Sequence, residues 1–345
     1  MKKAVVLGHF GFGHDKSNGQ TIKTKIVTNE LIKVFGDDQI GREDTMGGWK
    51  FLLRLVPTAW RMLRGYKSVI FLPAYKGVRV IVPLLVMMNV FFHRRLHYVV
   101  IGGWLPGFVK KYPLLRWALR RVHGIYVETK FMRDEIEAMG FKNLFVMPNF
   151  KPLHILDKDR ISVDEKETEP FKVCTFSRVM EQKGIADAIA AVELCNKKAG
   201  KTLFTLDIYG PVEEPEWFDA LMKNRNNVSY GGVIPFGESV NVLKNYFALL
   251  FPTLFPTEGF PGTLIDAFSA GVPVIASDVK ACREIIEEGK QGFLYPMNDF
   301  GALADKMLYA AGHLEQMRTM CACCIEKAAE YQPETIIQTL TGQIE

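Results

Sequence analysis

Short apolar runs alternate with longer segments of helical character along almost the whole chain, and one polar stretch interrupts the alternation. Strands that alternate with helices are typical of parallel α/β sheets, in which each helix makes the crossover between two strands. The predicted strands lie at residues 3–8, 68–73, 97–102, 124–128, 143–148, 171–177, 203–209, 228–231, 248–252 and 272–277. The predicted helices include residues 21–35, 77–92, 130–139 and 184–199.

The interruption falls at residues 151–170, where Asp, Glu and Lys are frequent and apolar residues are few. This composition indicates a linker. A chain of 345 residues is also longer than a single hydrophobic core usually organises. We therefore predict an α/β protein with two doubly wound parallel-sheet domains, over residues 1–150 and 171–324. Such sheets bind ligands beyond the carboxyl ends of their strands, so a cleft between the domains is the expected site.

The overall composition argues against several other classes of protein. Hydrophobic residues make up 48% and charged residues 23%, as in ordinary globular proteins. The most apolar stretch, residues 80–92, is shorter than the roughly 20 residues that span a bilayer. Residues 1–8 are expected to form a strand and not a signal peptide.

The six cysteines show no paired framework, which favours a reducing, cytoplasmic compartment. Cys321, Cys323 and Cys324 could form a metal clip, or they could pack in a helix as reduced side chains. Because no partner pair occurs elsewhere in the chain, the structural role is favoured.

A large charge asymmetry lies behind the net charge of +5. Residues 1–151 hold 25 Lys and Arg against 10 Asp and Glu, whereas the remainder holds 18 against 28. No Asp or Glu occurs between Asp44 and Glu128, and basic residues are interleaved there with aromatic ones. Solvated helix faces and a surface for an anionic membrane both fit this pattern. No nucleic-acid-binding motif accompanies it, so nucleic acid is not an expected partner.

Residues 246–266 carry the most specific chemistry in the chain. Their apolar first part predicts a buried strand, and their last part predicts the start of a helix. Between the two, Gly259 and Gly262 permit a tight loop whose backbone N–H groups, at the helix start, favour a phosphate. Glu258 before the loop and Asp266 within the helix add acceptors for hydroxyl groups. An anion cradle between two acids suits a sugar nucleotide.

The spacing from Glu258 to Asp266 resembles the E-x7-E motif of the retaining glycosyltransferases of family 4 (group 1), with Asp in place of the second Glu. Residues 268–277 are similar to the motif E-A-x-A-x-G-x-P-V-I-A of that family, and residues 284–296 to its G-x-x-G-x-L-x-P-x-x-D ending. The resemblance implies the GT-B fold, in which two Rossmann-like domains face each other across a cleft. The first would bind the acceptor and the second the nucleotide-sugar donor. A helix over residues 325–345 would cross back to the first domain.

Further donor-site candidates follow from the same resemblance. Residues 176–184 resemble the motif G-R-(L/V)-x-x-x-K-G, with Ser177 in place of the glycine. Arg178 and Lys183 would then neutralise a diphosphate leaving group without a metal. Four donor-binding candidates remain. Tyr209 and Gly210 lie at the end of the predicted strand 203–209, and Val233 and Ile234 follow the predicted strand 228–231.

The resemblance also implies roles for the loop and the two acids. Glu258 would bind hydroxyl groups of the transferred sugar, and Asp266 would bind the ribose hydroxyls. Because the loop proline has no N–H, the amides available to the diphosphate are those of Phe260, Gly262 and Thr263. No general base is assigned, since in retaining members of the family the donor phosphate is thought to help deprotonate the acceptor.

Two other motifs are set aside. Residues 8–13 contain a G-x-x-G-x-G pattern, but the predicted helix begins only near Thr21 and no acid follows at the distance that a dinucleotide requires, so NAD is not expected. Asp157 and Asp159 resemble the D-x-D of metal-dependent transferases, but they lie in the polar linker and not at a strand end. No metal and no other cofactor is therefore expected.

Acceptor-site candidates come from the first domain. Residues 17–21 resemble the N-terminal glycine loop of the family, so Gly19 and Gln20 would face the donor phosphates and the acceptor. Many members have His-Asp after the fourth strand. This chain has Gly103 and Trp104 there, and Trp104 would either stack on a sugar face or pack in the core. Basic residues would raise the positive potential near the loop: Lys16, Lys23 and Lys25. His9 and His14 are weak acceptor-site candidates, and His97 is expected to be structural.

Together these patterns predict a retaining hexosyltransferase on the cytoplasmic side, with peripheral contact to an anionic membrane through its basic first domain. It would move a sugar from a UDP-, GDP- or ADP-sugar to a glycan or lipid-linked glycan, in the assembly of a bacterial capsule or surface polysaccharide. The alternatives are a GT-B sugar-nucleotide epimerase, a soluble small-molecule glycosyltransferase and, from another class, a non-catalytic partner subunit. The base and sugar of the donor, the acceptor and the oligomeric state are left open.

Overall fold

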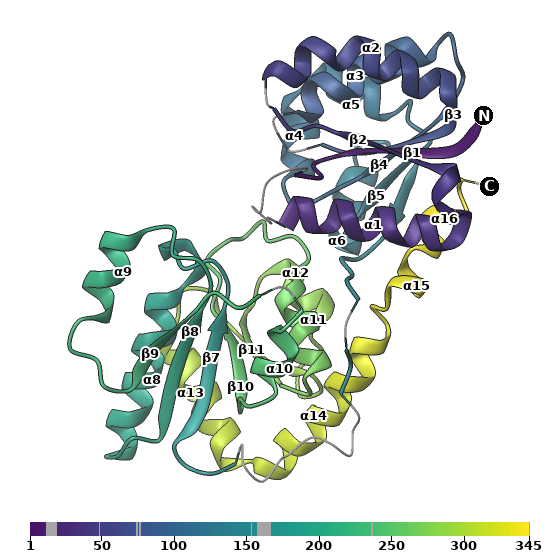
Figure 1. Cartoon of the computed structure of the whole chain (residues 1–345). Helices are drawn as coiled ribbons and strands as arrows, with labels where there is room; N and C mark the ends of the chain where they lie inside the picture. Colours follow the sequence, from purple (N-terminus) through teal and green to yellow (C-terminus); the bar gives the residue numbers. More distant parts are fainter. Residues whose placement is uncertain are drawn as a thin grey trace. The chain divides into compact units, whose positions relative to one another are not determined.

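The computed structural model describes residues 1–11, 19–47, 49–73, 75, 77–152, 154–156, 167–235 and 237–344. The chain forms two compact units (Figure 1). The first is Met1–Pro152 together with Gln332–Glu345, and the second is Leu153–Tyr331. Each unit has its own six-stranded parallel sheet with flanking helices, which confirms the predicted α/β class with two doubly wound sheets.

The first sheet has the strand order β2-β1-β3-β4-β5-β6, and all its neighbouring strands are parallel. Parallel neighbours need a crossover, and helices make most of the crossovers here. The strands are β1 (Lys2–Gly8), β2 (Ile40–Asp44), β3 (Tyr66–Leu72), β4 (Arg95–Val99), β5 (Gly124–Val127) and β6 (Leu144–Val146). The helices are α1 (Gly19–Phe35), α2 (Trp49–Gly65), α3 (Val78–Asn89), α4 (Leu105–Lys111), α5 (Pro113–Leu119) and α6 (Lys130–Glu137).

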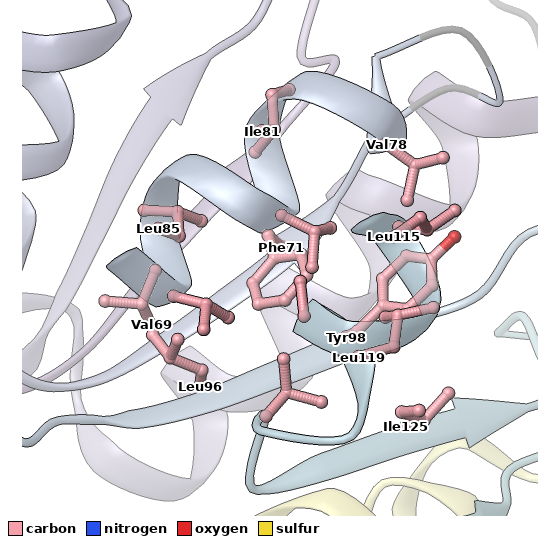
Figure 2. Packing of buried hydrophobic residues seen from close by; sticks show 14 of the residues in the cluster. Val69, Phe71, Val78, Ile81, Leu85, Leu96, Tyr98, Leu115, Leu119 and Ile125 are labelled. Atoms are coloured by element: carbon pink, nitrogen blue, oxygen red, sulfur yellow. The ribbon is translucent and has the colours of Figure 1, made fainter. Parts of the chain in front are cut away.

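Helices α2 to α6 cover one face of the first sheet, and α1 covers the other. Figure 2 shows how α3 and α5 pack on the strands, with Phe71 and Tyr98 stacked at 5.4 Å between ring centroids. The strands are apolar on both faces because helices cover both, as is typical of parallel sheets. On the α1 side, Ile337, Leu340 and Ile344 of the C-terminal segment join the core. They lie on or beside α16 (Gln338–Thr341), which follows α15 (Pro333–Ile336).

The second sheet has the order β12-β11-β10-β7-β8-β9. Helices α8 and α13 pack on one face, and α10, α11 and α12 pack on the other. The strands are β7 (Phe171–Phe176), β8 (Phe204–Tyr209), β9 (Val228–Gly232), β10 (Ala248–Phe251), β11 (Val274–Ser277) and β12 (Gly292–Tyr295). The helices are α8 (Ile185–Ala199), α9 (Pro215–Met222), α10 (Ser239–Leu243), α11 (Gly262–Ser269), α12 (Lys280–Ile285), α13 (Phe300–Gly312) and α14 (Leu314–Ala329).

Cysteine packing and helix length bear on two of the sequence interpretations. The six cysteines, all of them within the described residues, form no disulfide, and Cys321 and Cys324 are buried on α14, so packing accounts for them there. Burial raises the pKa of the thiols of Cys174, Cys195 and Cys282. Within the part of the chain that the structure describes, no helix is both long and apolar enough to cross a membrane.

Candidate functional site

The carboxyl ends of β7 and β10 lie side by side in the middle of the second sheet. From β7 the chain crosses over to β8 and β9 on one side and returns to β10 on the other, so the strand order reverses between β7 and β10. Ligands of open α/β sheets bind at such a point, beyond the carboxyl ends of the strands. Lys183 lies on the segment that leaves β7, and Glu258 lies on the segment that leaves β10.

Lys183 and Glu258 form an ion pair at this point, with 2.8 Å between Lys183 Nζ and Glu258 Oε2. The same carboxylate oxygen accepts a hydrogen bond of 2.9 Å from the hydroxyl of Thr253. The ammonium also lies 4.9 Å from the centre of the Phe255 ring. The two charged side chains are only 11% and 16% exposed, so little water screens them and their charges act strongly on a bound group. Two of the three predicted catalytic residues are thus in direct contact.

Gly184 makes the close approach of these two segments possible. It follows the short 3-10 turn η3 (Glu181–Lys183) and has a φ of +69°, in the left-handed region. A Cβ at this position would lie 1.8 Å from the carbonyl oxygen of Pro252, at the end of β10. A side chain would therefore be strained in φ and would also push the Lys183 turn away from β10.

Replacing Gly184 by alanine is expected to destabilise the second unit by about 3 kcal/mol or more, from the left-handed backbone and the clash together. Gly200 is a matched control, because its φ is +67° and nothing lies within 4 Å of the point that a Cβ would occupy there. Gly200→Ala should cost only the backbone part, about 1–2 kcal/mol. Urea denaturation followed by circular dichroism measures both, and equal losses in the two variants would contradict the role given to the close approach.

The loop before α11 carries the amides that the sequence assigns to a phosphate. Helix α11 begins at Gly262, and Thr263 is fixed there because its hydroxyl donates a hydrogen bond of 2.9 Å to the carbonyl oxygen of Phe176, at the end of β7. Phe260 is buried, with its ring 5.1 Å from that of Tyr331. Asp266 is only 3% exposed, on the second turn of the helix. Of the two predicted acids, Glu258 is therefore the more accessible.

Arg178, the third predicted catalytic residue, has a different partner. Its guanidinium lies 3.2 Å from Glu213 Oε1, and both side chains are about half exposed. Glu213 follows β8 and was not predicted from the sequence, because the resemblance at this strand end stops at Pro211. The structure thus separates Arg178, with its own carboxylate, from the paired Lys183 and Glu258.

The predicted nucleotide-side residues lie at the ends of β8 and β9. Gly210 has a φ of +131°, and a Cβ there would meet the carbonyl oxygen of Ser177 at 1.8 Å. The hydroxyl of Tyr209 lies 2.7 Å from that of Tyr246, which also donates to Asp207. Burial, with these hydrogen bonds, raises the pKa of Tyr246. Two further candidates follow the end of β9: Val233 is exposed and Ile234 is half-buried.

In the first unit, the start of α1 is held against the carboxyl ends of the strands. The side-chain amide of Gln20 donates a hydrogen bond of 3.0 Å to the carbonyl oxygen of Leu72, at the end of β3. His9 Nδ1 lies 2.7 Å from the hydroxyl of Thr21. The helix begins at Gly19, two residues earlier than the sequence indicates. Gln20 is therefore oriented toward the protein backbone in this structure.

A buried ion pair lies one turn further along α1 and also holds this helix against the sheet. Lys23 Nζ contacts Glu128 Oε1 and also donates to the carbonyl oxygen of Val100 at 3.2 Å. Glu128 Oε2 accepts the backbone N–H of Gly102 at 3.1 Å. Both side chains are 4% exposed. The pair therefore joins α1 to the loop after β4, where Gly103 and Trp104 lie.

This pair corrects one expectation from the sequence. Lys23 was expected to raise the positive potential at the glycine loop, but Glu128 neutralises it inside the protein. Glu128 could have been noticed as the first acid after the long acid-free stretch and as the last residue of a predicted strand. His97 is fully buried, its Nδ1 lies 3.0 Å from the hydroxyl of Tyr126, and burial lowers its pKa to about 3, so it is neutral and structural.

Trp104 packs within its own unit. Its indole N–H donates a hydrogen bond of 2.8 Å to the carbonyl oxygen of Ile101, and its ring lies 4.9 Å from that of Phe108. Of the two roles expected for Trp104, these contacts favour core packing over stacking on a sugar. Several other sequence expectations fall on residues outside the described ranges: His14, Lys16, Ser17, Asn18, Asp157 and Asp159.

Comparison with solved structures defines the class of fold. HepE of Anabaena, crystallised in complex with UDP and glucose, superposes with a TM-score of 0.74 over 99% of both chains, at 17% sequence identity. Sucrose-phosphate synthase of Thermosynechococcus elongatus gives a TM-score of 0.78 over 99% of this chain and 98% of its own, at 15% identity. With its two six-stranded parallel sheets, this protein therefore has the GT-B fold.

Sequence comparison matches part of the chain to a family. Residues 170–312, most of the second unit, match the family described as glycosyl transferases group 1, which confirms the group 1 resemblance for this part of the chain. The amylovoran biosynthesis glycosyltransferase AmsK of Erwinia amylovora is 27% identical over 158 residues, 44% of this chain and 39% of that protein. This chain thus spans well under half the length of that relative.

Proposed function

We propose that the protein is a retaining glycosyltransferase that moves a hexose from a nucleotide-sugar donor to a glycan or lipid-linked glycan acceptor. The observation that carries the proposal is the ion pair between Lys183 and Glu258 at the switch point of the second sheet. A cation and an acid lie there next to the glycine loop that opens α11. The match of residues 170–312 to group 1 glycosyltransferases supports the same conclusion.

In this proposal Lys183 exchanges partners when the donor binds. Its ammonium turns from Glu258 toward the diphosphate, and the negative charge that develops on the leaving group in the transition state is stabilised there. Glu258, released from the ion pair but still bonded to Thr253, accepts hydrogen bonds from the sugar hydroxyls. Arg178 supplies a second cation if it leaves Glu213. The chemistry assigned to these residues needs no metal.

The nucleotide would lie along the ends of β8 and β9. Gly210 and the backbone at Val233 and Ile234 would face the base and ribose, and the amides of Phe260, Gly262 and Thr263 the phosphates. Asp266 is 3% exposed, so a ribose would reach it only if the loop before α11 opened. In the first unit, Gly19, Gln20 and Gly103 would border the acceptor.

The setting that we propose is the assembly of bacterial surface polysaccharide, such as a capsule, on the cytoplasmic face of the membrane. AmsK is named for amylovoran biosynthesis, and a second relative, LpsB of Rhizobium meliloti, is named a lipopolysaccharide core mannosyltransferase. LpsB is 30% identical over 46% of this chain and 49% of its own length. The excess of basic residues in the first unit would suit contact with anionic lipid.

A thermal-shift panel of UDP, GDP and ADP sugars tests the donor assignment. One nucleotide should raise the melting temperature, because a ligand at about 100 times its Kd adds roughly 2.7 kcal/mol to the free energy of unfolding. The Lys183→Ala variant should lose this shift. If no nucleotide stabilises the protein, the non-catalytic partner subunit becomes the better assignment. Conversion of a donor to its epimer without any acceptor would instead indicate an epimerase.

A further inference from the structure

Helix α2 exposes large apolar side chains on its outer side. Leu53, Val56 and Trp60 are 73%, 54% and 51% exposed, and their spacing of three and four residues places them on one stripe of the helix. The Trp60 ring meets the ring of Phe92 edge-on at 4.9 Å. Phe91, beside it in the turn after α3, is 81% exposed. Through this contact the apolar stripe of α2 meets the turn after α3.

Arginines share this outer side of α2. Arg61 and Arg64 are exposed on the same turns as Trp60, and Arg61 binds Glu43 through two nitrogens, with 2.7 Å between Arg61 Nη2 and Glu43 Oε1. A helix that faces only water usually carries polar residues on its outer side. On α2, the two arginines instead share the outer side with the exposed apolar side chains of Leu53, Val56 and Trp60.

A cavity of about 860 Å³ opens where α2 ends. It lies at the amino ends of β1 and β3, where Lys2 pairs with Tyr66. Gln20 and Gly103 lie at the other end of the strands, beyond their carboxyl ends. Its charged lining residues are Lys2, Arg61 and Arg64, and no acid lines it among the described residues. Trp60 forms part of the wall, so the cavity and the apolar stripe are continuous.

We propose that this surface, the α2 face (Leu53, Val56, Trp60, Arg61, Arg64 and Phe91), docks on an anionic phospholipid bilayer. The phosphates of the head groups would lie in the cavity against Lys2 and Arg64, while Arg61 stays bonded to Glu43. Trp60, Leu53 and Phe91 would enter the interface between head groups and acyl chains, where aromatic side chains are favoured. The inference deepens the proposed membrane contact by giving it a site, and it requires no part of the donor chemistry.

A free phosphate compound would use the same cations, but it would leave the apolar stripe in water. The apolar side chains that are 51% to 81% exposed lie on α2 and on the turn after α3, which touch through Trp60 and Phe92, and exposed apolar side chains grouped in this way mark an interaction site. The acid-free stretch from Asp44 to Glu128 supplies the matching positive potential. Apolar and basic character together favour a bilayer as the source of the phosphate.

Co-sedimentation of the full chain with vesicles tests the proposal. Binding is expected to equimolar phosphatidylglycerol and phosphatidylcholine, and not to phosphatidylcholine alone. Arg64→Gln and Lys2→Gln should each lower the partition coefficient about fivefold. The double variant W60S/F91S should lower it about tenfold or more at unchanged net charge.

Matched controls lie on the second unit, where Phe300 is 45% exposed and Lys223 is also exposed. Phe300→Ser and Lys223→Gln should bind vesicles as the unaltered chain does, and all variants should keep the nucleotide-induced shift in melting temperature. That shift separates this proposal from the donor assignment. Vesicle binding that W60S/F91S leaves intact would overturn the bilayer proposal. So would full competition by free glycerol phosphate, which would identify a soluble phosphate ligand instead.

Discussion

Replacing Lys183 by alanine is expected to lower the rate of sugar transfer about a thousandfold, while the second unit keeps its fold. Removing one group that stabilises a developing negative charge typically costs about 100 to 1000-fold in rate. Lys183 would supply such a group and also orient Glu258, to which it is bonded at 2.8 Å. Glu258→Gln should lose a comparable amount, because the amide keeps the shape but accepts weaker hydrogen bonds from sugar hydroxyls.

The matched control for this loss is Lys198, which forms an ion pair with Asp305 on the same unit. That pair is 47% and 70% exposed, so Lys198→Ala should change transfer and stability little. Transfer from the donor found in the thermal-shift panel, measured as released nucleotide, compares the three variants. Full activity of Lys183→Ala would remove the ion pair from the mechanism, and equal losses in Lys198→Ala would point to a general loss of structure.

The sequence pattern could propose these residues as a donor site because they follow one another closely in sequence. Glu258, the glycine loop and Asp266 lie within a few residues of one another, and Lys183 belongs to a motif that runs from Ser177 to Gly184. What the pattern could not give is the partner of each charge. The bond from Lys183 to Glu258 joins residues 75 positions apart, and it depends on the pairing of β7 with β10.

Some of the elements that the sequence did not predict have a mixed composition. β2 reads Ile-Gly-Arg-Glu-Asp at the edge of its sheet, so it lacks the apolar run that marks a buried strand. α2 contains Pro57 and carries apolar residues on its outer side as well as its inner side. The apolar residues of α2 therefore do not follow a clear helical periodicity. The apolar residues on its outer side also make α2 a candidate docking surface.

The buried pair of Lys23 and Glu128 is the second place where a single change should have a large effect. Glu128→Gln or Lys23→Met would leave one charge inside the protein without its partner, which typically costs about 3–5 kcal/mol. The double variant K23M/E128Q removes both charges and keeps an acceptor for the N–H of Gly102. It should therefore be more stable than either single variant, by about 2 kcal/mol.

Guanidinium denaturation followed by tryptophan fluorescence measures this coupling, since four of the five tryptophans belong to the first unit: Trp49, Trp60, Trp104 and Trp117. Lys25→Met is the control on the same helix. Lys25 is exposed to solvent, so its loss should cost less than about 1 kcal/mol. If the double variant were as unstable as the sum of the single ones, the two charges would not be coupled. The pair would then have no part in holding α1 to the loop after β4, and the positions of Gln20 and Gly103 would need another cause.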